Sequence, residues 1–281
     1  MAEQIVPKRT RGRPRSVTTD TQGPTVQALD RGLMLLVMLS KQGKTNLTDL
    51  ALRIGMPPSS AHRLLTTLQK HGFVEFDETT QEWMIGVESF RVGSSFMQRT
   101  NLVDAARDVM RRLMEETEET ANLAIADDGD VVFMSQVETQ NPIRAFFSPG
   151  TRGPMHASGI GKVLLAEMAR KDIEQVLQKK GLPEFTDKTI TSPDRLFEDL
   201  ETTRMRGWAL DDEERISGMR CIAGPIYNAF GEAVAGISVS GPTVRFADHV
   251  IGEFGPKVKR AAAEVTELIG GTAPSRDGDR S

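Results

Sequence analysis

The chain has 281 residues, enough for two domains, and its 38% hydrophobic and 26% charged residues are typical of a folded globular protein. It contains no apolar run near the roughly 20 residues that span a bilayer and no apolar secretory signal. Its single cysteine excludes an internal disulfide framework, so we expect a cytoplasmic protein without a membrane partner. The net charge of −4 conceals an asymmetry, because residues 1–25 hold five basic and two acidic residues. Such an asymmetry is typical of a protein in which one part contacts phosphates.

Residues 1–24 are polar, basic and rich in proline and glycine, which predicts a disordered tail. Within it, Arg11-Gly12-Arg13-Pro14 resembles the core of a hook in which two arginines enter the narrow minor groove of A·T-rich DNA. The alternative is a solvated basic tail. Because the segment precedes a predicted DNA-binding domain, we favour groove contacts by Arg11 and Arg13.

Residues 25–86 have the pattern of a winged helix-turn-helix. Helical periodicity and turn residues predict three helices, over about 26–43, 47–54 and 58–71. Two short alternating runs, 73–76 and 82–85, predict a β-hairpin behind them. The first helix is amphipathic, with an apolar face made of Leu29, Leu33, Leu36, Val37 and Met38.

The third helix is the predicted DNA-reading element. It turns leucines and an alanine inward, and its opposite face holds hydroxyls, an imidazole and cations without an acidic residue: Ser59, Ser60, His62, Arg63, Thr66, Thr67 and Lys70. Arg63 can form paired hydrogen bonds to guanine, while the hydroxyls and Lys70 suit phosphates. Any surface helix has a polar face, but the preceding helix, the turn at Gly55 and the hairpin favour double-stranded DNA as a partner.

A second domain follows. We predict a linker helix over 87–101, an α/β domain over 102–270 and a disordered tail over 271–281. The α/β domain is expected to contain a hairpin over about 123–136, helices over 158–168 and 172–179, a strand over 233–240 and a closing helix over 248–269. The fold class is therefore α+β, with the winged helix-turn-helix joined by a helical linker to the larger domain.

Ser158-Gly159-Ile160-Gly161 opens one helix of the larger domain. Small residues at a helix start leave backbone N–H groups open to a ligand, and the helix dipole favours an anion there. Alternatively, the glycines only allow close packing. From the residues alone both interpretations stay open.

Over about residues 24–269 the chain resembles the IclR family of transcriptional regulators. The resemblance depends on five segments, in family order: Ala28-Leu29-Asp30-Arg31-Gly32, Pro58 through Leu68, Met155 through Lys162, Arg206 through Glu214, and Cys221-Ile222-Ala223-Gly224-Pro225-Ile226. It implies a winged helix-turn-helix paired with a GAF-like α/β effector-binding domain. It also implies homodimers or homotetramers on DNA.

Within the family the chain is most similar to the glyoxylate-sensing branch, that of the allantoin-pathway repressor and BhcR-like regulators. This resemblance implies a ligand pocket formed by Ser158, Gly159, Ile160, Asp211, Cys221, Ser238 and Ser240. Backbone N–H groups and serine hydroxyls can hold a carboxylate, and a small pocket would exclude larger acids. An ionised Asp211 accepts hydrogen bonds and suits a hydrated aldehyde or a hydroxyl. Pyruvate or another short oxo-acid is the alternative effector.

Each pocket residue also has an ordinary structural interpretation. Cys221 can be a small buried apolar residue, and Ser238 and Ser240 share one side of a strand as many residue pairs do. Asp211 begins an acidic run that can simply be solvated.

An enzyme and an architectural DNA-binding protein are the two alternatives to a transcriptional regulator. An enzyme is disfavoured because Cys221 and His156 lack a recognisable orienting partner, so we predict no catalytic residue. The four histidines have no metal-ligand spacing and there is no phosphate-binding loop, so neither a metal nor a cofactor is expected. An architectural DNA-binding protein is disfavoured because the second domain is larger than dimerisation requires.

Overall fold

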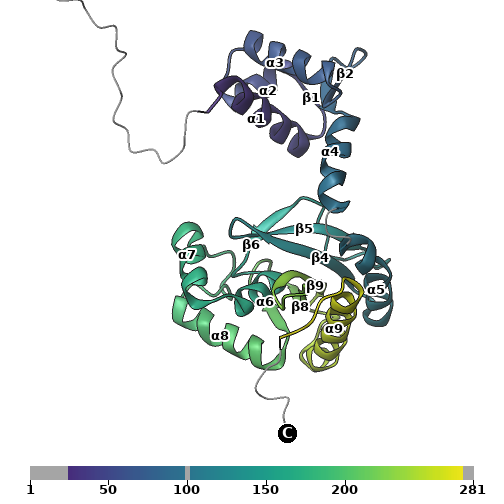
Figure 1. Ribbon diagram of the computed structural model, residues 1–281, viewed down its shortest axis with the longest axis vertical. Coiled ribbons are helices and arrows are strands. Elements are labelled where there is room, and N and C mark those ends of the chain that lie inside the picture. The colour runs from purple at the N-terminus through teal and green to yellow at the C-terminus, as the bar shows by residue number, and fades with distance from the viewer. Residues whose placement is uncertain (1–24, 99–101, 275–281) are drawn as a thin grey trace, which may run out of the picture. The chain divides into compact units, whose positions relative to one another are not determined.

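The computed structural model describes residues 25–98 and 102–274 and divides the chain into two compact units, Met1–Ser95 and Phe96–Ser281 (Figure 1). Each unit is described by itself. Among the described residues, no helix has both the length and the apolar character needed to cross a membrane. The expected α+β fold class is confirmed.

The smaller unit contains the predicted three helices and hairpin. Its elements are α1 (Gln27–Gln42), β1 (Thr45–Asn46), α2 (Leu47–Ile54), α3 (Pro58–Lys70), β2 (Val74–Asp77), β3 (Glu82–Ile85) and the first part of α4 (Val87–Gln98). The two-residue strand β1, which the sequence pattern did not predict, adds to the hairpin in the order β1-β3-β2. Gly55 ends α2 in the left-handed region at φ 70°, a conformation that glycine adopts without strain and that turns the chain sharply towards α3.

The core of the smaller unit lies where the three helices meet the hairpin. Leu35, Leu39, Leu50, Leu65 and Trp83 are buried there. The apolar face predicted for α1 is largely a different one, because Leu29, Leu33 and Val37 are 62%, 52% and 55% exposed. Helix α1 therefore has a buried apolar face and a second, exposed one.

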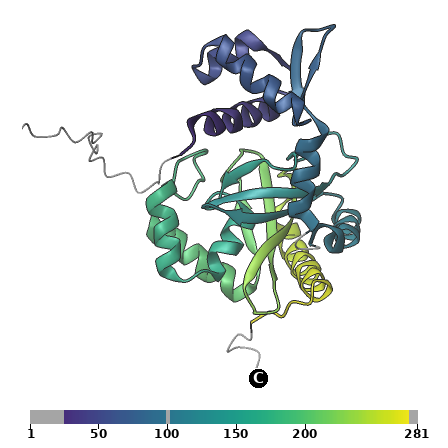
Figure 2. The same cartoon turned by 45° about the horizontal axis from the view of Figure 1, so that its top comes forward.

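The larger unit is built on a six-stranded antiparallel sheet with helices on both faces (Figure 2). The strands are β4 (Thr120–Asp127), β5 (Asp130–Val137), β6 (Arg152–Pro154), β7 (Ala209–Asp212), β8 (Met219–Tyr227) and β9 (Ala233–Pro242), in the order β6-β5-β4-β9-β8-β7. The helices are α5 (Leu102–Thr117), α6 (Gly159–Glu167), α7 (Arg170–Lys180), α8 (Pro193–Arg206) and α9 (Asp248–Leu268). The sequence pattern missed β6, β7, β8 and α8.

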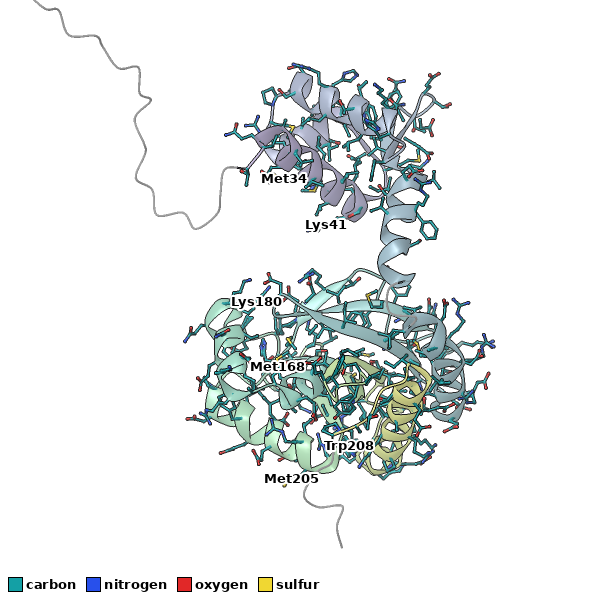
Figure 3. All side chains as sticks on the ribbon, viewed as in Figure 1. Met34, Lys41, Met168, Lys180, Met205 and Trp208 are labelled. Atoms are coloured by element: carbon teal, nitrogen blue, oxygen red, sulfur yellow. The ribbon has the colours of Figure 1, made fainter. Side chains whose placement is uncertain are left out.

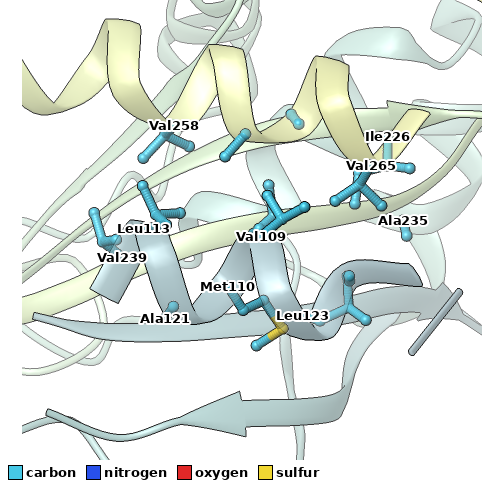
Figure 4. Close-up of a cluster of buried hydrophobic side chains, with 14 of the residues drawn as sticks. Val109, Met110, Leu113, Ala121, Leu123, Ile226, Ala235, Val239, Val258 and Val265 are labelled. Atoms are coloured by element: carbon cyan, nitrogen blue, oxygen red, sulfur yellow. The ribbon is translucent and has the colours of Figure 1, made fainter. Parts of the chain in front are cut away.

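Helices α5 and α9 cover one face of this sheet. In Figure 4, Val109 and Leu113 of α5 and Val258 of α9 point into a common layer above the strands, and all three are buried. Alternate strand residues such as Val239 complete the layer, as the two-residue period of a strand requires.

Helices α6, α7 and α8 lie on the opposite face. Helix α6 is buried along most of its length because it lies between the sheet and α8. Helix α8 is amphipathic: Leu196 and Leu200 are buried, whereas Met205 near its end projects outwards and is 74% exposed (Figure 3). The start of α6 is thereby fixed against the centre of the sheet.

Candidate DNA-binding surface and effector site

The predicted DNA contacts on α3 face solvent. Ser59, His62, Arg63, Thr66, Thr67 and Lys70 are exposed and Ser60 is half-buried. The inward side is also as expected, with Ala61 and Leu65 buried. Arg11 and Arg13 lie outside the described residues.

The cations of α3 are available to a partner. Within residues 25–98 and 102–274, no carboxylate lies within ion-pair distance of Arg63 or Lys70. The first turn of α3 has no acidic residue to oppose the positive end of the helix dipole. This surface can therefore accept phosphates without first breaking an ion pair.

Three other polar side chains of α3 are already engaged. The hydroxyls of Thr66 and Thr67 each donate to the backbone carbonyl four residues earlier, at 2.9 Å. The His62 ring contacts the Trp83 ring edge-on, with centroids 6.4 Å apart. Since a hydroxyl has one hydrogen to donate, these threonines would have to rotate to donate to a phosphate. Arg63 and Lys70 are the stronger candidates.

The hairpin is acidic. Residues 74–85 contain no lysine or arginine. At its tip, hydrogen bonds from the backbone N–H groups of Thr79 and Thr80 hold the pKa of Asp77 below its usual value, so that this carboxylate stays ionised. Phosphate contacts by the hairpin side chains are therefore disfavoured, and α3 is the element of this unit best suited to approach DNA.

In the larger unit, the start of α6 and the facing strands enclose a cavity of about 390 Å³. It is lined by every residue of the expected pocket: Ser158, Gly159, Ile160, Asp211, Cys221, Ser238 and Ser240. The volume is larger than a two- or three-carbon acid needs. The expected exclusion of larger acids by a small pocket is therefore not supported.

Strand register builds the polar end of this cavity. Asp211 of β7 pairs with Cys221 of β8, which pairs with Ser240 of β9, so the three side chains form a row on the face of the sheet that α6 covers. Ser238 lies two residues before Ser240 and shares its face. Residues far apart in the sequence thus meet because three strands are neighbours.

The two serines differ in their partners. The Ser240 hydroxyl accepts a hydrogen bond from Asn122 Nδ2 at 3.2 Å, and Asn122 is in turn held by Gln136 at 2.8 Å. Ser238 is 1% exposed, and its Oγ has no hydrogen-bond partner of normal geometry in the part of the chain that the structure describes, although it lies beside the Cys221 thiol. Because buried polar groups are almost always satisfied, an unpaired hydroxyl lining a cavity is a candidate for contact with a ligand.

The start of α6 supplies donors. Ser158 is the N-cap, and its Oγ accepts from Gly161 N at 3.3 Å. As the first helical residues, Gly159 and Ile160 have no intrahelical acceptor for their N–H groups.

The glycines also allow close packing. A Cβ on Gly159 would lie 2.9 Å from Cys221 Sγ, and one on Gly161 would lie 2.2 Å from the Met155 carbonyl oxygen. The two interpretations of these glycines are therefore compatible, because close packing brings the first turn of α6 beside Cys221, whose sulfur interacts with the Gly159 N–H group.

Burial changes the chemistry of two lining groups. Burial, and then the nearby negative charge of Glu214, raise the pKa of Asp211 to about 7, although Lys162 opposes the shift. Asp211 Oδ1 accepts from Glu214 N at 2.8 Å. Burial raises the pKa of the Cys221 thiol to about 11. Near neutral pH Asp211 can therefore donate or accept a proton, whereas Cys221 stays a thiol.

A buried lysine supports this site, and our sequence analysis gave it no role. Lys162 is fully buried on α6, and its Nζ lies 2.5 Å from Glu214 Oε1 and 3.1 Å from Asp199 Oδ2. It joins the cavity helix to α8 and to the loop after β7. The signal was present, since a lysine interrupts the apolar run of α6.

The aromatic and cationic lining of the cavity was also missed. Phe133 and Phe147 stack with their ring centroids 4.3 Å apart and form an apolar wall. The lining arginines are Arg144, Arg152, Arg215 and Arg220. The first, second and fourth pair with carboxylates. Arg215 instead lies over the Phe185 ring, 4.0 Å from its centroid.

Comparison with known families identifies the chain. Residues 28–78 match the IclR helix-turn-helix domain, and residues 94–267 match the bacterial transcriptional regulator IclR C-terminal domain. The chain belongs to the IclR family. It is a ligand-responsive transcriptional regulator, as predicted, and its relatives are regulators rather than enzymes.

Whole-chain relatives agree with this assignment. The HTH-type transcriptional regulator BhcR of Paracoccus denitrificans is 49% identical over 97% of this chain and 98% of its own length. The transcriptional repressor IclR of Escherichia coli is 43% identical over 93% of this chain and 96% of its own length. The crystal structure of the Thermotoga maritima IclR superposes with a TM-score of 0.73 at 29% identity, covering 87% of this chain and 99% of that one. IclR-family regulators bind DNA and small-molecule effectors.

Proposed function

We propose that this IclR-family regulator senses a small oxo-acid, glyoxylate, at the start of α6. The observation that carries the proposal is the polar end of the cavity, which the first turn of α6 and the buried Ser238 hydroxyl both line. Such donors suit a carboxylate. Asp211, with its pKa near 7, suits the hydrated aldehyde at the other end of the molecule. Pyruvate or another short carboxylate is the alternative ligand.

DNA binding belongs to α3 in this proposal. Arg63 reads a base edge, Lys70 contacts a phosphate, and Ser59, Ser60, His62 and Thr66 lie beside them. Arg11 and Arg13 enter the adjacent minor groove. The proposal is supported by the exposure of these α3 residues, by the unpaired cations and by the acidic hairpin.

We further propose that residues 25–86 form the DNA-binding domain, 87–101 the linker and 102–270 the effector domain, in a cytoplasmic homodimer or homotetramer. The division between the compact units, after Ser95, falls within the proposed linker. The exposed apolar face of α1, formed by Leu29, Leu33 and Val37, supports self-association. A ligand that changes the arrangement of the effector domains would change the spacing of paired α3 helices, and hence the affinity for two half-sites.

The test combines two measurements on the full chain. Calorimetric titration with glyoxylate, pyruvate, glycolate and oxalate should give tightest binding for glyoxylate. Electrophoretic shift of the protein's own promoter region should then show a changed affinity with glyoxylate present. Absence of binding to all four acids, or identical DNA binding with and without the bound acid, would contradict the proposal.

A further inference from the structure

The cavity is too large to select a two-carbon acid by size, so selectivity requires another device. We propose that Cys221 binds the aldehyde carbon of the effector covalently and reversibly, as a hemithioacetal. This inference rests on the proposed function, because it needs an aldehyde-bearing acid in the cavity. In this proposal Cys221 makes the cavity select an acid with an aldehyde group over one with a less electrophilic ketone or with no carbonyl group beside the carboxylate.

The position of the thiol fits this role. Cys221 Sγ lies so close to the first turn of α6 that a Cβ on Gly159 would be 2.9 Å from it. The Gly159 N–H group already interacts with this sulfur. A carboxylate that takes the N–H groups of Gly159 and Ile160 therefore places its neighbouring carbon, the aldehyde carbon of an oxo-acid, beside the sulfur. The position of the sulfur relative to α6 is set by the pairing of β8 and by the packing of α6 on the sheet.

A second observation points to a ligand. Ser238 is 1% exposed and lines the same cavity, and among the described residues its Oγ has no hydrogen-bond partner of normal geometry, although it lies beside the Cys221 thiol. The adduct has a hydroxyl where the aldehyde had a carbonyl oxygen. Ser238 and Ser240, on the strand next to Cys221, can hydrogen-bond that oxygen both before and after addition.

The step balances without an oxidant or a reductant. Where the acid enters as its hydrate, loss of water first gives the free aldehyde. A sulfur lone pair forms the new S–C bond, and the π electrons of the carbonyl move to oxygen. Asp211, opposite Cys221 in the strand register, gives a proton to that oxygen and takes up the thiol proton. The reverse sequence releases the aldehyde and restores the thiol.

The pKa of the Cys221 thiol, raised to about 11, is consistent with reversible formation of the hemithioacetal. Cys221 is half-buried, and a thiol that stays protonated resists oxidation and alkylation, which proceed through the thiolate. Hemithioacetal formation ends on a neutral sulfur and a neutral hydroxyl, so the adduct buries no new charge. A regulator that responds to changes in effector concentration must release its effector, so a bond between them has to be reversible.

The chain offers a direct test because Cys221 is its only cysteine. Glyoxylate labelled with ¹³C at the aldehyde carbon is added to the full-length protein and to Cys221→Ser, and the ¹³C spectrum is recorded. The wild-type protein should give a bound resonance distinct from the hydrate, and Cys221→Ser should not. By calorimetry, Cys221→Ser should lower the affinity for glyoxylate at least about tenfold more than it lowers the affinity for glycolate, which has no carbonyl to add to.

The outcomes separate the two proposals. Glyoxylate binding without an adduct resonance in the wild-type protein would overturn the covalent step and leave the proposed function intact. Failure of the wild-type protein to bind any of the acids would overturn the proposed function, and the covalent step with it. The wild-type spectrum decides the matter even if Cys221→Ser does not fold.

Discussion

Asp211 is the residue whose charge state is most sensitive to its surroundings. Burial raises its pKa most, the negative charge of Glu214 raises it further, and Lys162 opposes both, with a result of about 7. A bound carboxylate adds another negative charge beside Asp211 and so favours its protonated form. Binding of an acid is therefore coupled to the charge of this one side chain.

We predict that affinity for glyoxylate falls as the pH rises. Below pH 7 Asp211 is protonated and binding costs no proton; above pH 7 each bound acid must take up a proton, so the association constant falls by up to about tenfold per pH unit. Calorimetry between pH 6 and pH 8.5 measures this. Asp211→Asn should flatten the profile, and an equally steep profile in that variant would assign the dependence to another group.

Arg63 and Lys70 are predicted to act differently on DNA although both are exposed cations of α3. Arg63→Ala should cost about 1–3 kcal/mol and relax the preference for one base, whereas Lys70→Ala should weaken all sequences alike and lower the salt slope by about one. Fluorescence anisotropy at several salt concentrations separates the two effects. Lys171→Ala, an exposed lysine on α7, is the control. If both α3 variants lost the same affinity for every DNA sequence, Arg63 would not contact a base.

At the scale of the element, α6 depends on glycine at its first turn. Gly161→Ala would place a methyl group 2.2 Å from the Met155 carbonyl oxygen, so the helix start must shift. We expect a loss of about 3 kcal/mol of unfolding free energy, seen as a fall in Tm of roughly 5–10 °C, with weaker ligand binding.

Gly252 gives a matched comparison on α9, where an added Cβ meets nothing within 4 Å. Gly252→Ala should raise the helix stability by about 0.5–1 kcal/mol, since alanine favours the helix more than glycine does. Similar Tm values for the two variants would show that the close approach at Gly161 is readily relieved.

The elements that the sequence predicted share a clear periodicity. Helix α2 and the β2–β3 hairpin follow from apolar spacing and turn residues alone. Strand β8 was missed because it contains Gly224 and Pro225, which weaken a strand assignment. The structure shows why proline is tolerated: β7 pairs only as far as Ala223, and within residues 25–98 and 102–274 no other strand continues along that side of β8.

Some residues of the candidate site were also predicted from the sequence, and others were missed. The seven expected pocket residues came from a family resemblance, and all of them line one cavity. Arg215, Phe133 and Phe147 were missed because they carry no local motif and reach the cavity through tertiary contacts. Helix α8 was overlooked although its signals were present, with Pro193 in the first turn and Gly207 in the left-handed region after the last.

At the scale of the whole molecule, α1 has an apolar face that is exposed among the residues that the structure describes. If this face joins two copies, Leu33→Glu should shift the protein towards monomer in sedimentation and weaken binding to a two-half-site operator at least about tenfold. Val244→Glu changes an equally apolar residue, 83% exposed in the larger unit, and should leave both unchanged. If Leu33→Glu sediments like the wild-type protein, the two copies associate through a surface other than the exposed face of α1.

The cavity joins stretches of chain that are neighbours only after folding, around Ser158, Cys221 and Ser238. An acid held there adds contacts to the folded chain and none to the unfolded one, so it slows the openings through which cellular proteases gain access. A regulator built in this way persists longer while its signal is abundant. Its concentration in the cell would then follow the supply of the molecule that it detects.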